Sequence, residues 1–145
     1  MKYLFRYSLL LAVARRSHPH LLLTLLAAAR TASAVPPGND HFTNAFALGG
    51  YRGGVSVPTT EATKEALEPA HAGNGGGASV WFRWTAPVPG QLTLDTTGAD
   101  YDTLLAAYAG DSLGTLALLA ANDDNPGTAP RSLVRLTVAG GALNR

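Results

Sequence analysis

Apolar and polar residues alternate at every second position of residues 78–86 (ASVWFRWTA), and this alternation constrains the fold more than any other feature. A period of two residues is that of a β-strand with one face directed at a core. The same period returns in residues 91–96 (QLTLDT) and 131–138 (RSLVRLTV). These three segments are therefore predicted to be strands.

Two further segments, residues 103–110 (TLLAAYAG) and 116–121 (LALLAA), are apolar on both faces. Their short length and the turn-forming residues around them favour strands that are covered on both sides. Turn signals such as APVPG and NDDNPG separate the segments, and no long amphipathic helix lies between them. The sequence therefore predicts an all-β fold, an antiparallel β-sandwich or jelly-roll-like domain.

The first 34 residues have the features of a signal peptide. A basic start is followed by the apolar run of residues 21–29, and Ala32 and Ala34 occupy the small-residue positions of a cleavage site before Val35. A membrane-spanning helix needs about 20 apolar residues, which is more than this run provides. We expect export to the cell surface or medium, a Pro-rich leader at 35–38 and a domain at 39–145, with no membrane span after cleavage.

Removal of residues 1–34 would leave six positive and ten negative charges, a net charge of −4 with histidine neutral. A mildly acidic domain without a basic stripe is poorly suited to nucleic acids and to anionic membranes. Cysteine is absent, which excludes thiol catalysis and thiolate metal sites.

His71, with Glu65 and Glu68 nearby in sequence, is the only group that resembles an acid–base or metal site. No paired-ligand spacing, nucleophile elbow or phosphate-binding loop accompanies it. We interpret these residues as a solvated turn with hydrogen-bonded carboxylates.

Trp81 and Arg83 are the candidate ligand-binding residues. If Val80 and Phe82 face the core, alternation places Trp81 on the opposite face beside Arg83. An exposed indole there would stack on a sugar ring, whereas a covered one would pack under a loop or against the guanidinium. The sequence favours the covered arrangement and leaves the sugar platform as the alternative.

Five acidic residues lie at turns near strand ends: Asp100, Asp102, Asp111, Asp123 and Asp124. Loop carboxylates with neighbouring carbonyls are the ligands that Ca²⁺ prefers. Aspartate is also an ordinary turn former, and no EF-hand loop is present. We therefore favour the turn role, with Ca²⁺ at Asp100, Asp102, Asp123 and Asp124 as the alternative and no other cofactor.

Several phrases occur in an order that resembles the bacterial pre-peptidase C-terminal-like domains. They are NDHFTNAFALGG, the stretch from ATKEALEPAH to QLTLDT, DYDTLLAAYAGDSLGTLALLAANDD and VRLTVAGG. The first begins at residue 39 and the last ends at residue 141. The resemblance implies a secreted β-sandwich accessory module without catalytic residues, with calcium in some members. In that family one or two further strands follow, so we expect an incomplete sandwich with an exposed edge strand, through which the chain either self-associates or is completed by a strand from a partner.

The resemblance implies that the chain is a non-catalytic module that docks on a partner protein or an extracellular polysaccharide. A carbohydrate-binding module that uses an exposed Trp81 is the second hypothesis, and a small secreted hydrolase is the third.

Overall fold

The computed structural model describes residues 8–15 and 35–140. Within them the chain forms seven β-strands and two 3₁₀ turns, with no α-helix, which confirms the all-β prediction. The strands are β1 Ser8–Arg15, β2 Phe46–Leu48, β3 Ala78–Thr85, β4 Gly90–Asp95, β5 Thr103–Ala109, β6 Ala117–Asn122 and β7 Leu133–Val138; the 3₁₀ turns are η1 Phe42–Asn44 and η2 Leu113–Thr115.

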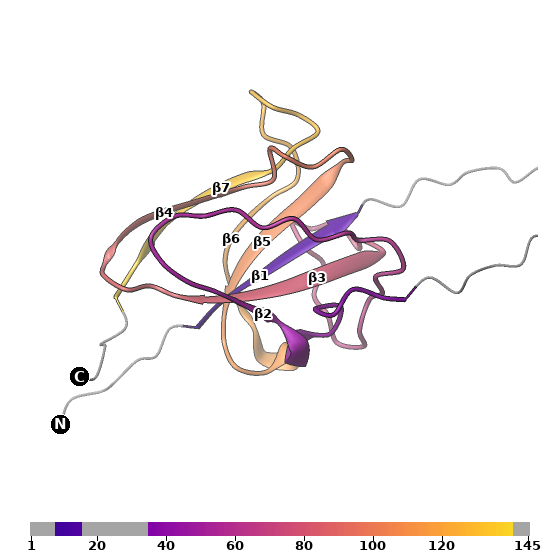
Figure 1. Ribbon diagram of the computed structural model, residues 1–145, viewed down its shortest axis with the longest axis horizontal. Helices are drawn as coiled ribbons and strands as arrows, with labels where there is room; N and C mark the ends of the chain where they lie inside the picture. The colour runs from indigo at the N-terminus through magenta and orange to yellow at the C-terminus, as the bar shows by residue number, and fades with distance from the viewer. Residues whose placement is uncertain (1–7, 16–34, 141–145) are drawn as a thin grey trace, which may run out of the picture.

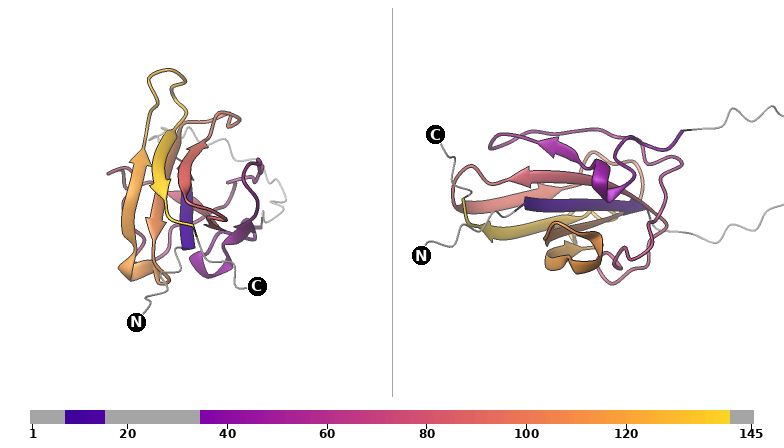
Figure 2. Two further views of the ribbon diagram at one scale, coloured as in Figure 1. Left: turned by 90° about the vertical axis from the view of Figure 1, so that its left-hand side faces the viewer. Right: turned by 90° about the horizontal axis from the view of Figure 1, so that it is seen from below.

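The strands form two sheets, which are antiparallel except where β2 runs parallel to β3. The larger sheet has the order β2-β3-β1-β5-β6, and the smaller one pairs β4 with β7 (Figure 1). The connection between β6 and β7 projects beyond the strands in Figures 1 and 2. The five segments that the sequence predicts as strands are β3 to β7.

β1 is a central strand of the larger sheet, although Ser8–Arg15 lies inside the predicted signal peptide. It pairs antiparallel with β3 on one side and with β5 on the other (Figure 1). The rest of that predicted signal peptide, residues 1–7 and 16–34 with its cleavage site, lies outside the described residues. Cleavage before Val35 stays a prediction, and β1 is a strand that the proposed domain of 39–145 did not include.

One hydrophobic core lies between the two sheets. Leu11, Val80, Phe82 and Leu105 of the larger sheet are each at most 6% exposed, and they form a buried cluster with Val134 of β7. Leu92, Leu94 and Leu136 of the smaller sheet pack against this cluster. The predicted alternation in residues 78–86 is therefore real, because Val80 and Phe82 share this face.

A second core covers the opposite face of the larger sheet. It contains Trp81, Tyr108, Leu10 and Ala12, and Phe42 of η1 packs against them with Leu113 of η2 and Leu116 beside it. These turns, rather than a third sheet, cover that face. On the outer face of β3, Ser79 and Trp81 are consequently buried, whereas Arg83 near the end of the strand is exposed.

Asn39 and Asp40 anchor the chain before η1 to the larger sheet. Asn39 exchanges two hydrogen bonds with the backbone of Trp81, both 2.9 Å long. Both carboxylate oxygens of Asp40 accept hydrogen bonds from Thr63, at 2.6 and 2.8 Å. The bonds from Thr63 to Asp40 hold the loop of residues 59–65 against the chain that precedes η1.

β6 corrects one sequence prediction. We expected residues 116–121 to be covered on both faces, but Leu118 and Leu119 are 58% and 47% exposed. The physical reason is that β6 is the edge strand of the larger sheet, and among the described strands it pairs only with β5. In the described part of the chain, no helix is long and apolar enough to cross a membrane.

Candidate functional site

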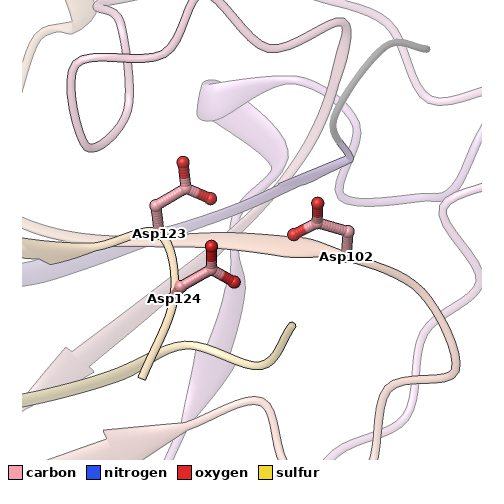
Figure 3. A group of neighbouring side chains, drawn as sticks. All are labelled: Asp102, Asp123 and Asp124. Carbon is pink, nitrogen blue, oxygen red and sulfur yellow. The ribbon is translucent and has the colours of Figure 1, made fainter. Parts of the chain in front are cut away.

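Three acidic residues meet where β5 begins and β6 ends. Asp102 directly precedes β5, and Asp123 and Asp124 directly follow β6. Because β5 and β6 are antiparallel neighbours, with Leu105 opposite Asn122, these positions lie at the same end of the sheet. One carboxylate oxygen from each of the three acids lies within 4.8 Å of the others (Figure 3).

The spacing of these oxygens suits a hard cation. Two oxygens that bind one Ca²⁺ at about 2.4 Å lie no more than about 4.8 Å apart. Asp102 and Asp123 are half-buried and Asp124 is exposed, so a cation would have protein on one side and water on the other. Three carboxylates supply fewer than the six to eight oxygens that Ca²⁺ takes, and backbone carbonyls or water would have to complete the shell.

A hydroxyl network holds the two loops that carry these acids. The Ser132 hydroxyl lies 2.5 Å from the carbonyl oxygens of both Thr103 and Asp123. The Thr103 hydroxyl lies 2.6 Å from that of Thr96 and 3.1 Å from that of Ser132. Asn122 ties the end of β6 to the start of β7, since its Oδ1 accepts a 2.8 Å hydrogen bond from Leu133 N–H. The site is therefore built on strand ends.

Two of the predicted acids lie apart from this group. Asp100 is exposed and lines the groove described below, although the sequence grouped it with Asp102 as a metal ligand. Asp111 is exposed in the turn between β5 and η2. Asp102, Asp123 and Asp124 are thus the part of the predicted calcium set that the fold brings together.

His71 is buried, which corrects the interpretation of this segment as a solvated turn. It is 1% exposed, and its Nε2 lies 2.7 Å from Glu68 Oε1 while its Nδ1 lies 2.8 Å from the Tyr108 hydroxyl. A carboxylate can only accept, so Nε2–H donates to Glu68; in the neutral ring Nδ1 then accepts from Tyr108. The carboxylates are hydrogen-bonded as expected, but inside the protein.

Glu65 extends this cluster towards the surface. Its backbone N–H donates to Glu68 Oε2 at 3.0 Å, and its own Oε2 accepts a 2.6 Å hydrogen bond from Phe42 N–H. His41, whose side chain is 55% exposed, places Nδ1 3.3 Å from Glu65 Oε1. The sequence grouped Glu65, Glu68 and His71 correctly but missed His41 and Tyr108, which only the fold brings near them.

Two of the residues around His71, Glu68 and Tyr108, have shifted pKa values. Burial alone would raise the pKa of Glu68, but hydrogen bonds from His71, Ser79 and the Glu65 backbone outweigh it, so the pKa lies below the usual 4.5. Burial, with the nearby charge of Glu68, raises the pKa of Tyr108 to about 12. Glu68 is therefore ionised and Tyr108 neutral at pH 7, the states in which both can hold His71.

Trp81 is fully buried, so the alternative in which it forms an exposed sugar platform is wrong. Its ring makes edge contacts with Phe42 and His71, at centroid distances of 5.3 and 5.6 Å. The physical reason is the second core, which covers this face of β3 with η1 and η2. Arg83, two residues further along, is exposed near the end of β3. The covered arrangement that the sequence favoured is confirmed, with aromatic rings as the cover.

A groove of about 1240 Å³ opens between the two sheets beside β4. Val80, Phe82 and Trp84 of β3 and Leu92 and Leu94 of β4 line it, and residues 47–60 form its other wall. In that wall Tyr51 and Val55 are 73% and 53% exposed. Trp84 Nε1–H donates to Gly50 O at 3.0 Å, which fixes the start of the wall. The sequence signal for this groove was an aromatic residue inside a glycine-rich loop, GGYRGG.

No protein family model, curated protein or solved structure matches this chain. The resemblance to pre-peptidase C-terminal-like domains therefore depends on the phrases of the sequence alone.

Proposed function

We propose that this chain is a non-catalytic accessory module of an exported bacterial protein, a jelly-roll-like sandwich of the pre-peptidase C-terminal-like kind, that docks on an extended segment of a partner protein. The observation that carries this proposal is the groove beside β4, which has apolar side chains at its floor and polar ones along its walls. It combines buried side chains at its floor with exposed Tyr51 and Val55 at its rim.

A polypeptide suits this groove because β4 has one unpaired edge. Among the described strands β4 pairs only with β7, so its other edge presents backbone N–H and C=O groups. An extended segment can add to such an edge through its main chain and place every second side chain in the groove. Residues of both charge signs, Arg52 and Asp100 among them, line the groove and would fix the register of the segment.

The accessory role is favoured over the hydrolase hypothesis by the position of His71. A general base must reach a substrate proton, and His71 is enclosed between Glu68 and Tyr108. In the described part of the chain neither His41 nor His71 hydrogen-bonds a serine or threonine hydroxyl, the arrangement that activates a nucleophile.

The proposal is tested with peptides. Full-length protein, immobilised, is used to select binders from a phage-displayed library of random 12-residue peptides. We expect enrichment of sequences in which apolar residues occupy alternate positions. Val55→Asp should weaken binding of the synthetic peptides at least about tenfold, because it places a charge at the apolar rim. Leu118→Asp is the matched control, because Leu118 is equally exposed but lies on β6, and it should leave binding unchanged.

Two results would contradict docking of a polypeptide. One is the absence of any enriched peptide, and the other is binding that Val55→Asp leaves intact. If the protein instead sediments with insoluble cellulose or chitin, and Tyr51→Ala abolishes this while Tyr51→Phe does not, the groove binds a polysaccharide by ring stacking.

We also propose that Asp102, Asp123 and Asp124 bind Ca²⁺. The observation that favours this is the approach of three carboxylates to within 4.8 Å on loops held by Ser132 and Asn122. Like charges at this distance repel each other, and a divalent cation would turn the repulsion into attraction. The bound cation would hold the two loops together, and in this way it would stabilise the module that docks on the partner.

A further inference from the structure

β1 occupies a position between two strands that are not paired with each other. β3 and β5 are both antiparallel to β1, and each has one other neighbour in the sheet, β2 and β6 respectively. Ala12 lies opposite Trp81 on one side and opposite Ala106 on the other. Among the described strands, the two halves of the larger sheet are therefore joined by strand pairing only through Ser8–Arg15 (Figures 1 and 2).

The side chains of β1 show which sequence this position accepts. Leu11 belongs to the core between the sheets, and Val13 packs against it. Leu10 and Ala12 belong to the second core, where Trp81 and Tyr108 already fill the space. Ala12 and Ala14 are 0% and 1% exposed, so only a small side chain fits at either position. The position thus selects large apolar residues on the face of Leu11 and Val13, and on the other face a large residue where Leu10 lies and small ones where Ala12 and Ala14 lie.

Direct pairing of β3 with β5 could not replace β1 without rebuilding the molecule. With one strand between them, β3 and β5 lie two strand spacings apart, about 9.6 Å. Closing this distance would move the β5–β6 half across the smaller sheet, and Val134 of β7 would lose its contacts with one half or the other. A replacement strand would keep all of these contacts.

We propose that the space between β3 and β5 is a strand-acceptor site, which Ser8–Arg15 fills in the uncleaved chain and which an extended segment of the partner protein fills after export has removed residues 1–34. The inference rests on the proposed export, and its site, between β3 and β5, is distinct from the groove beside β4; it defines the chemistry of the segment that enters this second site. The donor segment runs antiparallel to both neighbours, carries large apolar residues where Leu11 and Val13 lie, and has alanine or glycine where Ala12 and Ala14 lie.

The test uses the full chain with a specific protease site inserted between Arg15 and Val35. The protein is folded intact in the cytosol of a bacterial host, purified and then cut. A fluorescent peptide with the sequence of residues 6–17 is added, and its binding is followed by anisotropy while gel filtration follows release of the amino-terminal fragment. We expect the peptide to displace that fragment and bind at its position.

Two altered peptides make the result specific. A peptide with Ala12→Arg should bind at least about 100-fold more weakly, because its guanidinium would be buried without a partner. A peptide with Ala12→Leu should bind about tenfold more weakly, because it overpacks the layer of Trp81 and Tyr108. If the cut protein precipitates, the unaltered peptide present during cutting should keep it soluble and the Ala12→Arg peptide should not.

The inference is overturned if the cut protein releases its fragment and keeps its melting temperature without binding the peptide. It is equally overturned if the Ala12→Arg peptide binds or protects as well as the unaltered one, or if the original fragment never exchanges. Export is checked separately: a secreted chain that begins at Val35 supports the proposed function, and one that retains Ser8–Arg15 contradicts it whatever the peptides do.

Discussion

Glu68 is a charged residue inside the protein, and its partners account for that. His71 and the Glu65 backbone donate to its two oxygens, at 2.7 and 3.0 Å. Tyr108 in turn fixes the other nitrogen of His71. A buried carboxylate with such partners stabilises the fold only while it is ionised.

Glu68→Gln should therefore reduce the dependence of stability on acid pH. Because the folded pKa of Glu68 lies below 4.5, its contribution is present above about pH 4.5 and is lost as the pH falls through the folded value. At pH 7 we expect Glu68→Gln to lower the free energy of unfolding by about 1–3 kcal/mol, because the amide oxygen still accepts from His71 but the NH2 group cannot accept from Glu65 N–H. Urea unfolding at several pH values gives the free energy of unfolding of the unaltered protein and of the variant. A difference that stays constant from pH 7 to pH 3 would contradict this role.

Trp81 should behave as a core residue. Trp81→Ala is expected to lower the free energy of unfolding by about 3–5 kcal/mol, since it empties the second core between Phe42, His71 and Tyr108. Arg83→Ala, on the same face but exposed, should change it by no more than about 0.5 kcal/mol. Chemical denaturation measures both variants, and equal effects would show that Trp81 is not enclosed.

The strands could be predicted from the sequence wherever side-chain alternation reports burial. Val80 and Phe82 alternate with polar or outward residues, and so do Leu92 and Leu94, so β3 and β4 were recognisable. β5 was recognisable as a strand covered on both faces. β1 was not, because an apolar segment that follows a basic start has the same composition in a signal peptide as in a central strand. The exposure of Leu118 also escaped prediction, since composition does not show which strand lies at a sheet edge.

β1 should contribute to stability as a central strand does. Leu11→Ala should lower the free energy of unfolding of the full chain by about 2–5 kcal/mol, because Leu11 is 4% exposed in the core between the sheets. Leu118→Ala removes the same atoms from exposed β6 and should cost no more than about 0.5 kcal/mol. If Leu11→Ala unfolds at the same denaturant concentration as the unaltered chain, β1 does not belong to the sheet.

The acidic cluster was predictable in part. Asp123 and Asp124 are neighbours in the sequence, and Asp102 precedes the strand that pairs with theirs, so antiparallel pairing brings the three together. Asp100 is only two residues before Asp102, yet the chain turns between them and directs it to the groove. Such a change of direction in a short turn leaves no periodic signal in the sequence.

Calcium should stabilise the two loops by mass action. Millimolar Ca²⁺ is expected to raise the melting temperature and EDTA to reverse the change, because the folded state alone brings the three carboxylates together. Asp123→Asn should reduce the effect, and Asp111→Asn, in another turn, should not. Identical melting curves with Ca²⁺ and with EDTA would show that the three aspartates do not bind Ca²⁺ in the folded protein.

The whole molecule has a second surface that favours association, the edge at β6. Leu118 and Leu119 are exposed there beside a strand edge that no described strand pairs with. Such an edge invites pairing with another copy unless a charge blocks it. We expect the full chain to self-associate in a concentration-dependent manner in sedimentation equilibrium, and Leu119→Lys to reduce the association. A chain that stays monomeric at every concentration would contradict this expectation.

Hydrogen exchange of the full chain tests most directly whether Ser8–Arg15 is the strand that joins the two halves of the larger sheet. Protein that retains residues 1–34 is placed in deuterated buffer, and peptides that cover β1, β3 and β5 are followed by mass spectrometry. We expect the amides of β1 to exchange as slowly as those of β3 and β5, because all three strands open in one cooperative step. Complete exchange of residues 8–15 within seconds, while β3 and β5 stay protected, would show that this segment is not part of the sheet.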